Sequence, residues 1–200
     1  MLPVMKPAES HELIVLGGGS AGHAAARTAA KLGVKTALVE SAGTLGGLCI
    51  LRGCMPSKAL IVTANRMREI RDAARFGIRV ADPELDLLAL RQRVESLVSE
   101  FRQHREEEMK QGDYLLFRGS ARFTRSHELE VAEPDGTRRL LSANAFVIAT
   151  GSSASVPKLE GLQGTPFWTS SDVIRLPFLP GHLAVVGAGA IGILAARHKG

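Results

Sequence analysis

This chain has very little cysteine, few aromatic residues and no long uninterrupted apolar run. Its 200 residues include two cysteines and 4% aromatic residues. So few thiols exclude a secreted scaffold held together by several disulfides. No run of about 18 consecutive apolar residues is present, which argues against a membrane-spanning helix. The first ten residues, MLPVMKPAES, lack the apolar core of a secretory signal. We therefore expect a cytoplasmic protein without a membrane partner.

The charge of the chain is mildly positive but is not concentrated in one region. The formal net charge is +5, and the Lys and Arg residues are scattered among acidic ones. Because nucleic-acid-binding proteins usually carry clustered basic side chains and aromatic residues, we expect no nucleic-acid partner. A weak positive field suits an anionic cofactor instead.

The first 40 residues have the pattern of a strand, a helix and a second strand. The apolar run Leu13–Leu16 ends at a glycine, an alanine-rich stretch covers residues 21–32, and GVKTALVE supplies a second apolar run. Gly33 is well placed to end the helix. This order predicts a βαβ unit with a parallel sheet, and hence an α/β fold.

The period of the apolar residues changes along the rest of the chain. Residues 48–75 and 82–110 have the spacing of helices. From Tyr114 the spacing becomes that of strands, over YLLFRGSARF, HELEVAE and RRLLSANAFVIAT, with a hairpin turn at PDGT, residues 134–137. A last apolar segment, HLAVVG, predicts a strand that leads into a second glycine-rich stretch.

A glycine fingerprint lies between the first strand and the first helix. Gly17, Gly19 and Gly22 fit the pattern G-x-G-x-x-G. In this pattern the first glycine allows a tight turn, the second lets the backbone approach a pyrophosphate, and the third packs helix on strand. Glu40, at the end of the next strand, can accept hydrogen bonds from ribose hydroxyls. His23 is more simply explained as a packed or solvent-facing residue than as a catalytic one.

The two cysteines, Cys49 and Cys54, lie together in GGLCILRGCMPSK. Three interpretations compete. A structural zinc site needs four N or S ligands, but the chain has no second cysteine pair and no histidine pair at zinc-finger spacing. Two inert buried thiols would need neither the neighbouring glycines nor the proline. The third interpretation is a redox disulfide whose thiols exchange with a substrate.

The redox interpretation makes a geometrical demand on the backbone. Residues i and i+5 of an ideal helix lie roughly 8 to 9 Å apart, whereas a disulfide needs Cα atoms within about 7 Å. If Cys49 and Cys54 are bonded, the helix start between them must be distorted, and Gly53 permits this most easily. A nearby helix N-terminus, with Lys58 one turn further along, would favour thiolate over thiol.

GGLCILRGCMPSK resembles the redox signature of the FAD-dependent pyridine nucleotide-disulfide oxidoreductases of class I. Members include dihydrolipoamide dehydrogenase, mercuric reductase, glutathione reductase and soluble transhydrogenase. The shared features are Gly-Gly, two cysteines separated by four residues with glycine before the second, and Pro-Ser-Lys. FVIATGS, residues 146–152, is similar to the flavin segment of that family, and TSSDVIRLPFLPGHLAVVGAGAIG to its run into the NAD(P) fingerprint. The resemblance covers nearly the whole chain, but less than half of a typical member.

The resemblance implies a role for each matching residue, with FAD and NAD(P) as cofactors. Cys49 would be the interchange thiol that attacks the substrate, Cys54 would contact the flavin, and Lys58 would lie near the flavin ring. The other implied FAD-binding residues are Gly17, Gly19, Gly22, Glu40, Ala121, Thr150, Gly151 and Ser152. The implied NAD(P)-binding residues are Gly187, Gly189 and Gly192. No metal-binding residue is implied.

Two positions depart from the family pattern. Leu51 stands where members commonly carry asparagine, and Leu194 stands where glutamate is usual after the second fingerprint. The sequence also lacks the later Gly-Asp flavin motif and the C-terminal interface domain that supplies a His–Glu pair across a homodimer. A catalytically incompetent flavin-domain fragment, arising from a frameshift or a pseudogene, is therefore one alternative.

The resemblance implies a Rossmann-like FAD-binding domain over residues 1–155, with a parallel sheet, an antiparallel β segment and the redox-disulfide helix. A linker over 156–181 and the truncated start of a second Rossmann-like, NAD(P)-binding domain over 182–200 would follow. The implied activity is electron transfer between NAD(P)H, FAD and a Cys49–Cys54 disulfide, with a small-molecule or protein-bound disulfide as substrate. PSKALI leans toward the dihydrolipoamide dehydrogenase type, and mercuric reductase-like chemistry is the alternative because a thiolate pair can hold a soft metal ion.

Overall fold

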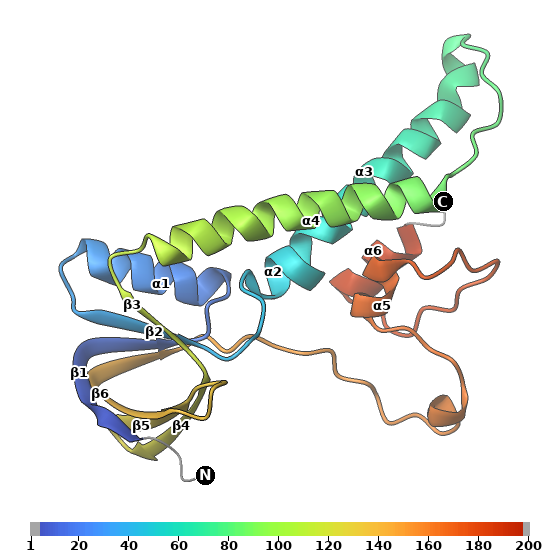
Figure 1. Cartoon of the computed structure of the whole chain (residues 1–200). Helices are drawn as coiled ribbons and strands as arrows, with labels where there is room; N and C mark the ends of the chain where they lie inside the picture. Colours follow the sequence, from blue (N-terminus) through green and yellow to red (C-terminus); the bar gives the residue numbers. More distant parts are fainter. Residues whose placement is uncertain (1–4, 198–200) are drawn as a thin grey trace. The chain divides into compact units, whose positions relative to one another are not determined.

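The computed structural model describes residues 5–197, and their contacts group into two compact units. The first unit takes the chain up to Cys49 together with residues 101–152, and the second takes residues 50–100 together with those from Ser153 onward. The first unit contains the β-sheet, and the second is mainly helical (Figure 1). The domain boundaries that the sequence predicts, at residues 155 and 181, stay predictions.

The first unit is built on a six-stranded mixed sheet with the strand order β3-β2-β1-β6-β5-β4. β1 pairs in parallel with β2 and β6, and β2 in parallel with β3, whereas β5 pairs antiparallel with β6 and β4. The predicted α/β fold, with a parallel sheet and an antiparallel segment, is therefore confirmed. The strands are β1 Met5–Leu16, β2 Thr36–Glu40, β3 Leu115–Arg118, β4 Ser120–Arg125, β5 Glu128–Ala132 and β6 Arg138–Ile148.

The predicted βαβ unit is present at the start of the chain. α1, Ser20–Lys31, connects β1 to β2 and covers one face of the sheet (Figure 1). Gly33 follows the helix with φ +82°, and its amide donates to the Ala30 carbonyl oxygen at 2.9 Å. The amide of Val34 donates to the Ala29 carbonyl oxygen at 3.1 Å. These two bonds form a Schellman motif, so Gly33 ends the helix as predicted.

Two apolar clusters form the core of this unit, one on each face of the sheet. Val15 and Leu38 pack against Ala26 of α1, and Met109 and Tyr114 belong to the same cluster. Since successive side chains of a strand point to opposite faces, the neighbours of Val15 enter the second cluster. Its members are Ile14, Leu16, Ala37, Val39, Phe117, Leu129, Val131, Leu141 and Ala143.

β1 is longer than the apolar run that predicted it. The strand already begins at Met5, although residues 9–12 are all polar or charged. Pairing with β6, where His11 lies opposite Ala143, fixes the strand conformation there. The predicted hairpin turn is confirmed between β5 and β6, where Gly136 has φ +86°.

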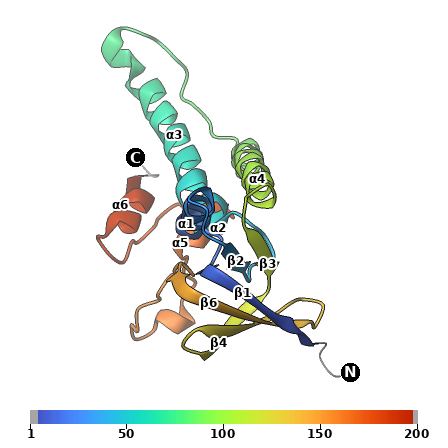
Figure 2. The same cartoon turned by 90° about the vertical axis from the view of Figure 1, so that its left-hand side faces the viewer.

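The helix predicted over residues 48–75 is confirmed, but it is divided at Gly53. The dihedral angles of Gly53, φ −138° and ψ −116°, are not helical. The resulting elements are α2 Gly47–Arg52, α3 Cys54–Arg71 and the 3-10 helix η1 Asp72–Phe76. From η1 an extended segment leads back to α4, Leu87–Lys110 (Figure 2).

α4 begins at Leu87 rather than near Asp82. The Asp86 carboxylate accepts a hydrogen bond from the Ala89 amide at 2.9 Å, which is the bonding of an N-cap residue. The helix start is therefore set by this cap. Further along, Leu90 of α4 packs in one cluster with Leu60 of α3 and forms part of the core of the second unit.

The strand that HLAVVG predicts before the second fingerprint is not formed. Residues 183–186 have no regular secondary structure, and Val186 is exposed. A strand needs a neighbour that takes up its backbone hydrogen bonds, and the described part of the second unit contains no other strand. The remaining elements of this unit are η2 Leu162–Gly164, α5 Ser170–Arg175 and α6 Ala190–Arg197.

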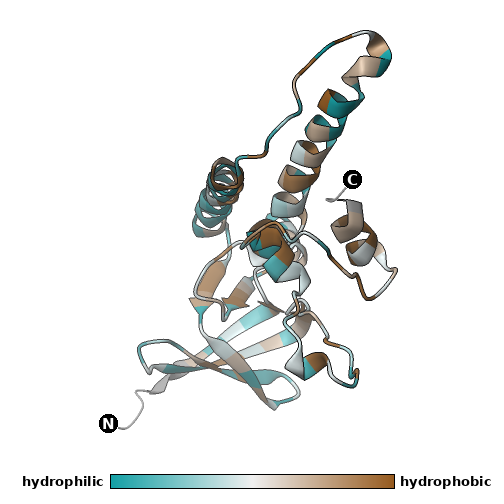
Figure 3. Ribbon diagram, turned by 90° about the vertical axis from the view of Figure 1, so that its right-hand side faces the viewer, coloured by the Kyte–Doolittle hydropathy of each residue, from teal (hydrophilic) through white to brown (hydrophobic). Residues whose placement is uncertain are grey.

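Among the described residues, one stretch, Gly47–Phe76, is long and apolar enough to cross a membrane by length and composition alone. The stretch is interrupted at Gly53, and apolar and hydrophilic turns alternate along α3 (Figure 3). A single stretch of this kind is weak support for a membrane span, because core helices meet the same criterion. The absence of a membrane partner stays a prediction.

Candidate dinucleotide-binding site

The predicted fingerprint lies at the carboxyl edge of the parallel strands. β1 ends just before the fingerprint loop, residues 17–22, β2 ends at Glu40, and β6 ends just before residues 149–152. β2 and β6 lie on opposite sides of β1. Open α/β sheets bind ligands at such a switch point, beyond the carboxyl ends of the strands. The fold thus brings together three of the segments in which binding residues are predicted.

The loop leaves no room for side chains at its first and third glycines. Gly17 has φ +99°, and a Cβ atom there would overlap the Ala149 carbonyl oxygen. A Cβ atom on Gly22 would overlap the carbonyl oxygen of Gly17. The amide of Gly17 also donates to the Val39 carbonyl oxygen at 2.8 Å, and that of Ala149 to the Leu16 carbonyl oxygen at 2.8 Å. The start of α1 is therefore held directly against the strand ends, as a pyrophosphate-binding loop requires.

Glu40 fastens this loop with a buried carboxylate. Its Oε2 accepts a hydrogen bond from the Gly18 amide at 2.7 Å, and its Oε1 accepts one from the Ala42 amide at 2.7 Å. Each carboxylate oxygen can accept a further hydrogen bond, so the donor set still fits a ribose hydroxyl. The contact with the loop is observed, and the contact with a ribose stays a prediction.

Gly47 also packs against the fingerprint, a contact that the sequence pattern did not predict. Gly47 has φ +66°, and a Cβ atom there would lie 2.5 Å from the Cα atom of Gly19. The first residue of α2 is thereby held against the second glycine of the loop. Cys49 follows two residues later in α2. The paired glycines before Cys49 were the available signal, but the partner of Gly47 lies 28 residues away (47 − 19).

A second missed contact fixes the segment that follows β2. The Arg118 guanidinium, at the end of β3, donates to the carbonyl oxygens of Ala42 and Gly43, the latter at 2.8 Å. Ala121, a predicted FAD contact, follows in β4 and is exposed. In the sheet, β4 is the edge strand beside β5, at the end opposite to β2 and β3, so a contact of Ala121 with FAD stays a prediction.

The two cysteines occupy consecutive helices on either side of Gly53. Cys49 lies in α2 as a free, half-buried thiol, so the Cys49–Cys54 disulfide is not formed in this structure. Cys54 is the first residue of α3 and is exposed, and Lys58 is exposed one turn later. The helix is interrupted at Gly53, where the disulfide interpretation demanded a distortion. The pairing and the role of Lys58 stay predictions.

The second fingerprint repeats the backbone geometry of the first. Gly187 has φ +117°, and a Cβ atom on Gly192 would overlap the Gly187 carbonyl oxygen. The Ile193 amide donates to the Gly189 carbonyl oxygen at 3.0 Å, the bond that also opens α1. The loop therefore has the turn of a dinucleotide site without the preceding strand. NAD(P) binding by these glycines stays a prediction.

His23 lies in a buried cluster directly behind the first fingerprint. Its Nδ1 lies 3.2 Å from the Tyr114 hydroxyl oxygen, and its Nε2 lies 3.5 Å from Oε2 of Glu108. Burial lowers the pKa of His23, and the positive charge of Arg105 acts in the same direction. The imidazole is therefore neutral at pH 7. The sequence allowed either a packed or a solvent-facing environment for His23, and the structure shows the packed one.

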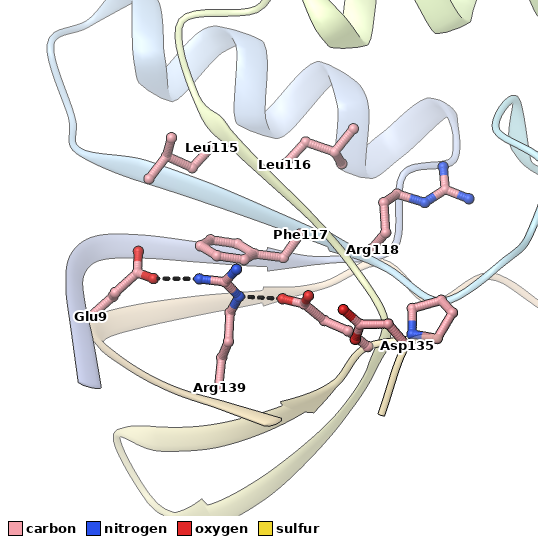
Figure 4. A pocket seen from close by; sticks show the side chains of 9 residues that line it. Glu9, Leu115, Leu116, Phe117, Arg118, Asp135 and Arg139 are labelled. Carbon is pink, nitrogen blue, oxygen red and sulfur yellow. Dashed lines mark hydrogen bonds and ion pairs between the residues drawn. The ribbon is translucent and has the colours of Figure 1, made fainter. Parts of the chain in front are cut away.

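A separate pocket of the first unit lies between β1, β3 and β6 (Figure 4). Arg139 donates to Glu9 at 3.0 Å and also to Glu133. Its guanidinium carbon lies 5.5 Å from the centre of the Phe117 ring. The carboxylates of Glu9 and Glu133 are thus already paired with Arg139. We therefore interpret these pocket residues as a structural ion-pair cluster of the sheet. Within residues 5–197, no three His, Cys, Asp or Glu side chains are grouped to hold a metal ion.

Comparison with known proteins finds one family over nearly the whole chain. The sequence model described as pyridine nucleotide-disulphide oxidoreductase matches residues 11–198. The chain is 32% identical over 191 residues to a mercuric reductase of Shewanella putrefaciens and 35% identical over 188 residues to a dihydrolipoyl dehydrogenase of Chlamydia pneumoniae. These alignments cover 94% and 92% of this chain, but 34% and 39% of the two relatives. The chain therefore spans between a third and two fifths of their length.

A solved structure shows the same fold. The Cu(II) complex of an HOCl-induced flavoprotein disulfide reductase from Escherichia coli matches with a TM-score of 0.76 and 28% sequence identity. The match covers 95% of this chain and 41% of that protein. The mixed six-stranded sheet with its helices is thus similar to that of a flavoprotein disulfide reductase.

Proposed function

Because this chain belongs to the pyridine nucleotide-disulphide oxidoreductase family, we propose that it is the flavin-binding part of an FAD-dependent disulfide oxidoreductase. The observation that carries the proposal is the closed glycine loop at the switch point of the sheet. Gly17 and Gly22 exclude side chains there, and Glu40 holds the loop from the neighbouring strand. The redox motif includes Gly47, which packs against the same loop.

In this proposal FAD lies along the carboxyl edge of β1, β2 and β6. The amides at the start of α1 face its pyrophosphate, and Glu40 accepts a hydrogen bond from a ribose hydroxyl. The further contacts come from Ala121 and from the segment Thr150–Ser152. Bound FAD supplies two-electron chemistry between NAD(P)H and the thiols. NAD(P)H is assigned to the second fingerprint, Gly187, Gly189 and Gly192.

The cysteines carry the exchange with a disulfide substrate. The Cys49 thiolate attacks one substrate sulfur and forms a mixed disulfide, and the other substrate sulfur leaves as a thiolate. The Cys54 thiolate then attacks Sγ of Cys49, so that the second substrate sulfur leaves and a Cys49–Cys54 disulfide remains. The substrate gains two electrons and the cysteine pair loses two. The N-terminus of α3 and the positive charge of Lys58 stabilise the thiolate at Cys54.

Within the family we favour the dihydrolipoamide dehydrogenase type, with mercuric reductase-like chemistry as the second candidate. The relatives support both, since a dihydrolipoyl dehydrogenase is 35% identical to this chain and a mercuric reductase of Streptomyces lividans is 34% identical. A thiolate pair can bind a soft metal ion as well as exchange with a disulfide. Assays of the full-length gene product with lipoamide, glutathione disulfide and Hg(II) distinguish these types by kcat/KM. We assign that product to the cytoplasm, as a homodimer.

The thiol roles are tested by the absorbance of the chain loaded with FAD and reduced with dithiothreitol under anaerobic conditions. A Cys54 thiolate beside the flavin gives a long-wavelength band. We expect Cys54→Ser to abolish this band and Cys49→Ser to keep it, because the second variant leaves Cys54 as a thiolate. A band that survives in Cys54→Ser contradicts the roles. A flavin-loaded wild-type chain without any band supports the incompetent fragment instead.

A further inference from the structure

Four side chains form a cluster that braces the first fingerprint from behind, and we call it the His23 cluster. It consists of His23 in α1, Arg105 and Glu108 in the last turns of α4, and Tyr114 before β3. Met109, next to Glu108, is fully buried, and its Cε atom would lie 2.7 Å from a Cβ atom on Gly18. The end of α4 is thus packed against both the loop and the helix that follows it.

Burial of the cluster favours a neutral imidazole. Burial raises the pKa of Tyr114, so its hydroxyl keeps its proton and can donate to Nδ1 of His23. The remaining ring proton of His23 then lies on Nε2, which faces the Glu108 carboxylate at 3.5 Å without forming a hydrogen bond. A protonated ring would place a positive charge in a buried site, which costs free energy.

The charged groups around His23 come from two helices. On α4, Arg105 donates to Glu108 at 3.0 Å, and His104 lies 3.6 Å from the other oxygen of the same carboxylate. Arg27, on the same helix as His23, adds a second positive charge. Arg105 and Arg27 both oppose protonation of His23, and Glu108 favours it. Burial acts together with the two arginines, and the neutral form prevails.

We propose that His23 is a positioning residue for the dinucleotide loop, which it fixes by linking the first turn of α1 to Tyr114 and Glu108. The link holds the loop closed on Glu40 and Ala149. This inference rests on the proposed function in one respect, namely that FAD is the ligand of the loop. Opening of the loop exposes His23 to water. There the imidazole takes up a proton when the pH falls below the ordinary pKa of histidine. Acidification therefore favours the open loop.

The test is amide hydrogen exchange of residues 17–24 in the full chain at pH 7.5 and pH 5.5, corrected for the intrinsic pH dependence of exchange. If His23 has its ordinary pKa of about 6.5 in the open state, the equilibrium constant for opening rises by up to about tenfold when the pH is lowered from 7.5 to 5.5. His23→Asn places an amide oxygen near the Tyr114 hydroxyl and cannot titrate. We expect this variant to keep the loop protected at both pH values. His23→Leu removes both links, and we expect faster exchange at both pH values.

His104→Gln is the matched control, because His104 touches the same carboxylate from the solvent side and its side chain is 73% exposed. We expect it to behave as the wild-type chain does. Exchange in His23→Asn with the wild-type pH dependence, or wild-type protection in His23→Leu, overturns the inference. A parallel FAD titration separates the two proposals. A wild-type chain that binds no FAD contradicts the proposed function, while the exchange data still decide the role of His23.

Discussion

At the scale of single residues, His11 of β1 is a buried base in an apolar setting. Both of its ring nitrogens are buried without a hydrogen-bond partner in the described part of the chain. Its ring meets the Phe117 ring edge-on, with the centroids 5.9 Å apart. Burial lowers the pKa of His11, Lys35 acts in the same direction, and Glu9 opposes them. The folded state therefore holds a neutral imidazole among core side chains.

This burial predicts a loss of stability in acid. The pKa of His11 is lower in the folded chain than its ordinary value of 6.5, so below about pH 6.5 the unfolded chain binds more protons and the free energy of unfolding falls. The loss from one such group is at most about 1.4 kcal/mol at pH 5.5. We expect His11→Leu to reduce the difference in free energy of unfolding between pH 7.5 and pH 5.5, measured by urea denaturation.

His127→Gln is the control for this measurement, because His127 lies at the exposed start of the β5–β6 pair. We expect this variant to keep the wild-type pH dependence. His23 adds its own contribution, so part of the acid loss remains in His11→Leu. A variant that lost as much stability in acid as the wild-type chain would show that His11 does not titrate on unfolding.

The site residues show what spacing alone can predict. The glycines of the fingerprint were predictable because the turn needs a left-handed residue at Gly17 and close packing at Gly22, both within six residues of chain. The contact of Gly47 with the loop joins residues distant in sequence and depends on how α2 packs. The backbone bonds of Arg118 likewise follow from the pairing of β3 with β2. Neither has a local pattern.

At the scale of elements, the end of α1 gives a test of the left-handed position at Gly33. An added Cβ atom there would meet nothing within 4 Å, so the cost of a side chain is conformational alone. We expect Gly33→Ala to lower the free energy of unfolding by about 1 kcal/mol, measured by urea denaturation. FAD affinity should not change, since Gly33 lies at the opposite end of α1 from the fingerprint.

Gly43→Ala is the matched control for the Gly33 variant. Gly43 is also open to solvent on its Cβ side, but it has no positive φ. We expect its free energy of unfolding to stay within experimental error of the wild-type value. Equal stability of the two variants would contradict the assignment of Gly33 as the left-handed end of the helix.

The order of elements was largely predictable, and the exceptions have tertiary causes. The polar residues 9–12 of β1 show no apolar pattern, because pairing with β6 fixes them as a strand and the side chain that they bury in the core is that of His11. The apolar residues 183–186 have the composition of a strand but find no partner in the described part of their unit. Composition predicts that a segment can be a strand, and pairing decides whether it is one.

At the scale of the whole molecule, the two units divide the residues of the proposed chemistry. The first unit contains the fingerprint, Glu40, Ala121, the segment 150–152 and Cys49. The second contains Cys54, Lys58 and the second fingerprint. The sequence motifs predicted this set of residues, but not that residues 50–100 group separately from the sheet. The proposed FAD site can therefore be tested independently of the proposed thiol chemistry, through the first unit's own glycines.

The most direct test of the central claim is titration of the purified chain with FAD, followed by flavin fluorescence and isothermal calorimetry. We predict one FAD bound per chain. Gly22→Ala should weaken binding by at least about tenfold, or roughly 1.4 kcal/mol, because the new methyl group overlaps the Gly17 carbonyl oxygen. Gly43→Ala should bind as the wild-type chain does. No binding by the wild-type chain, or unchanged affinity in a folded Gly22→Ala variant, would contradict the claim that the fingerprint holds FAD.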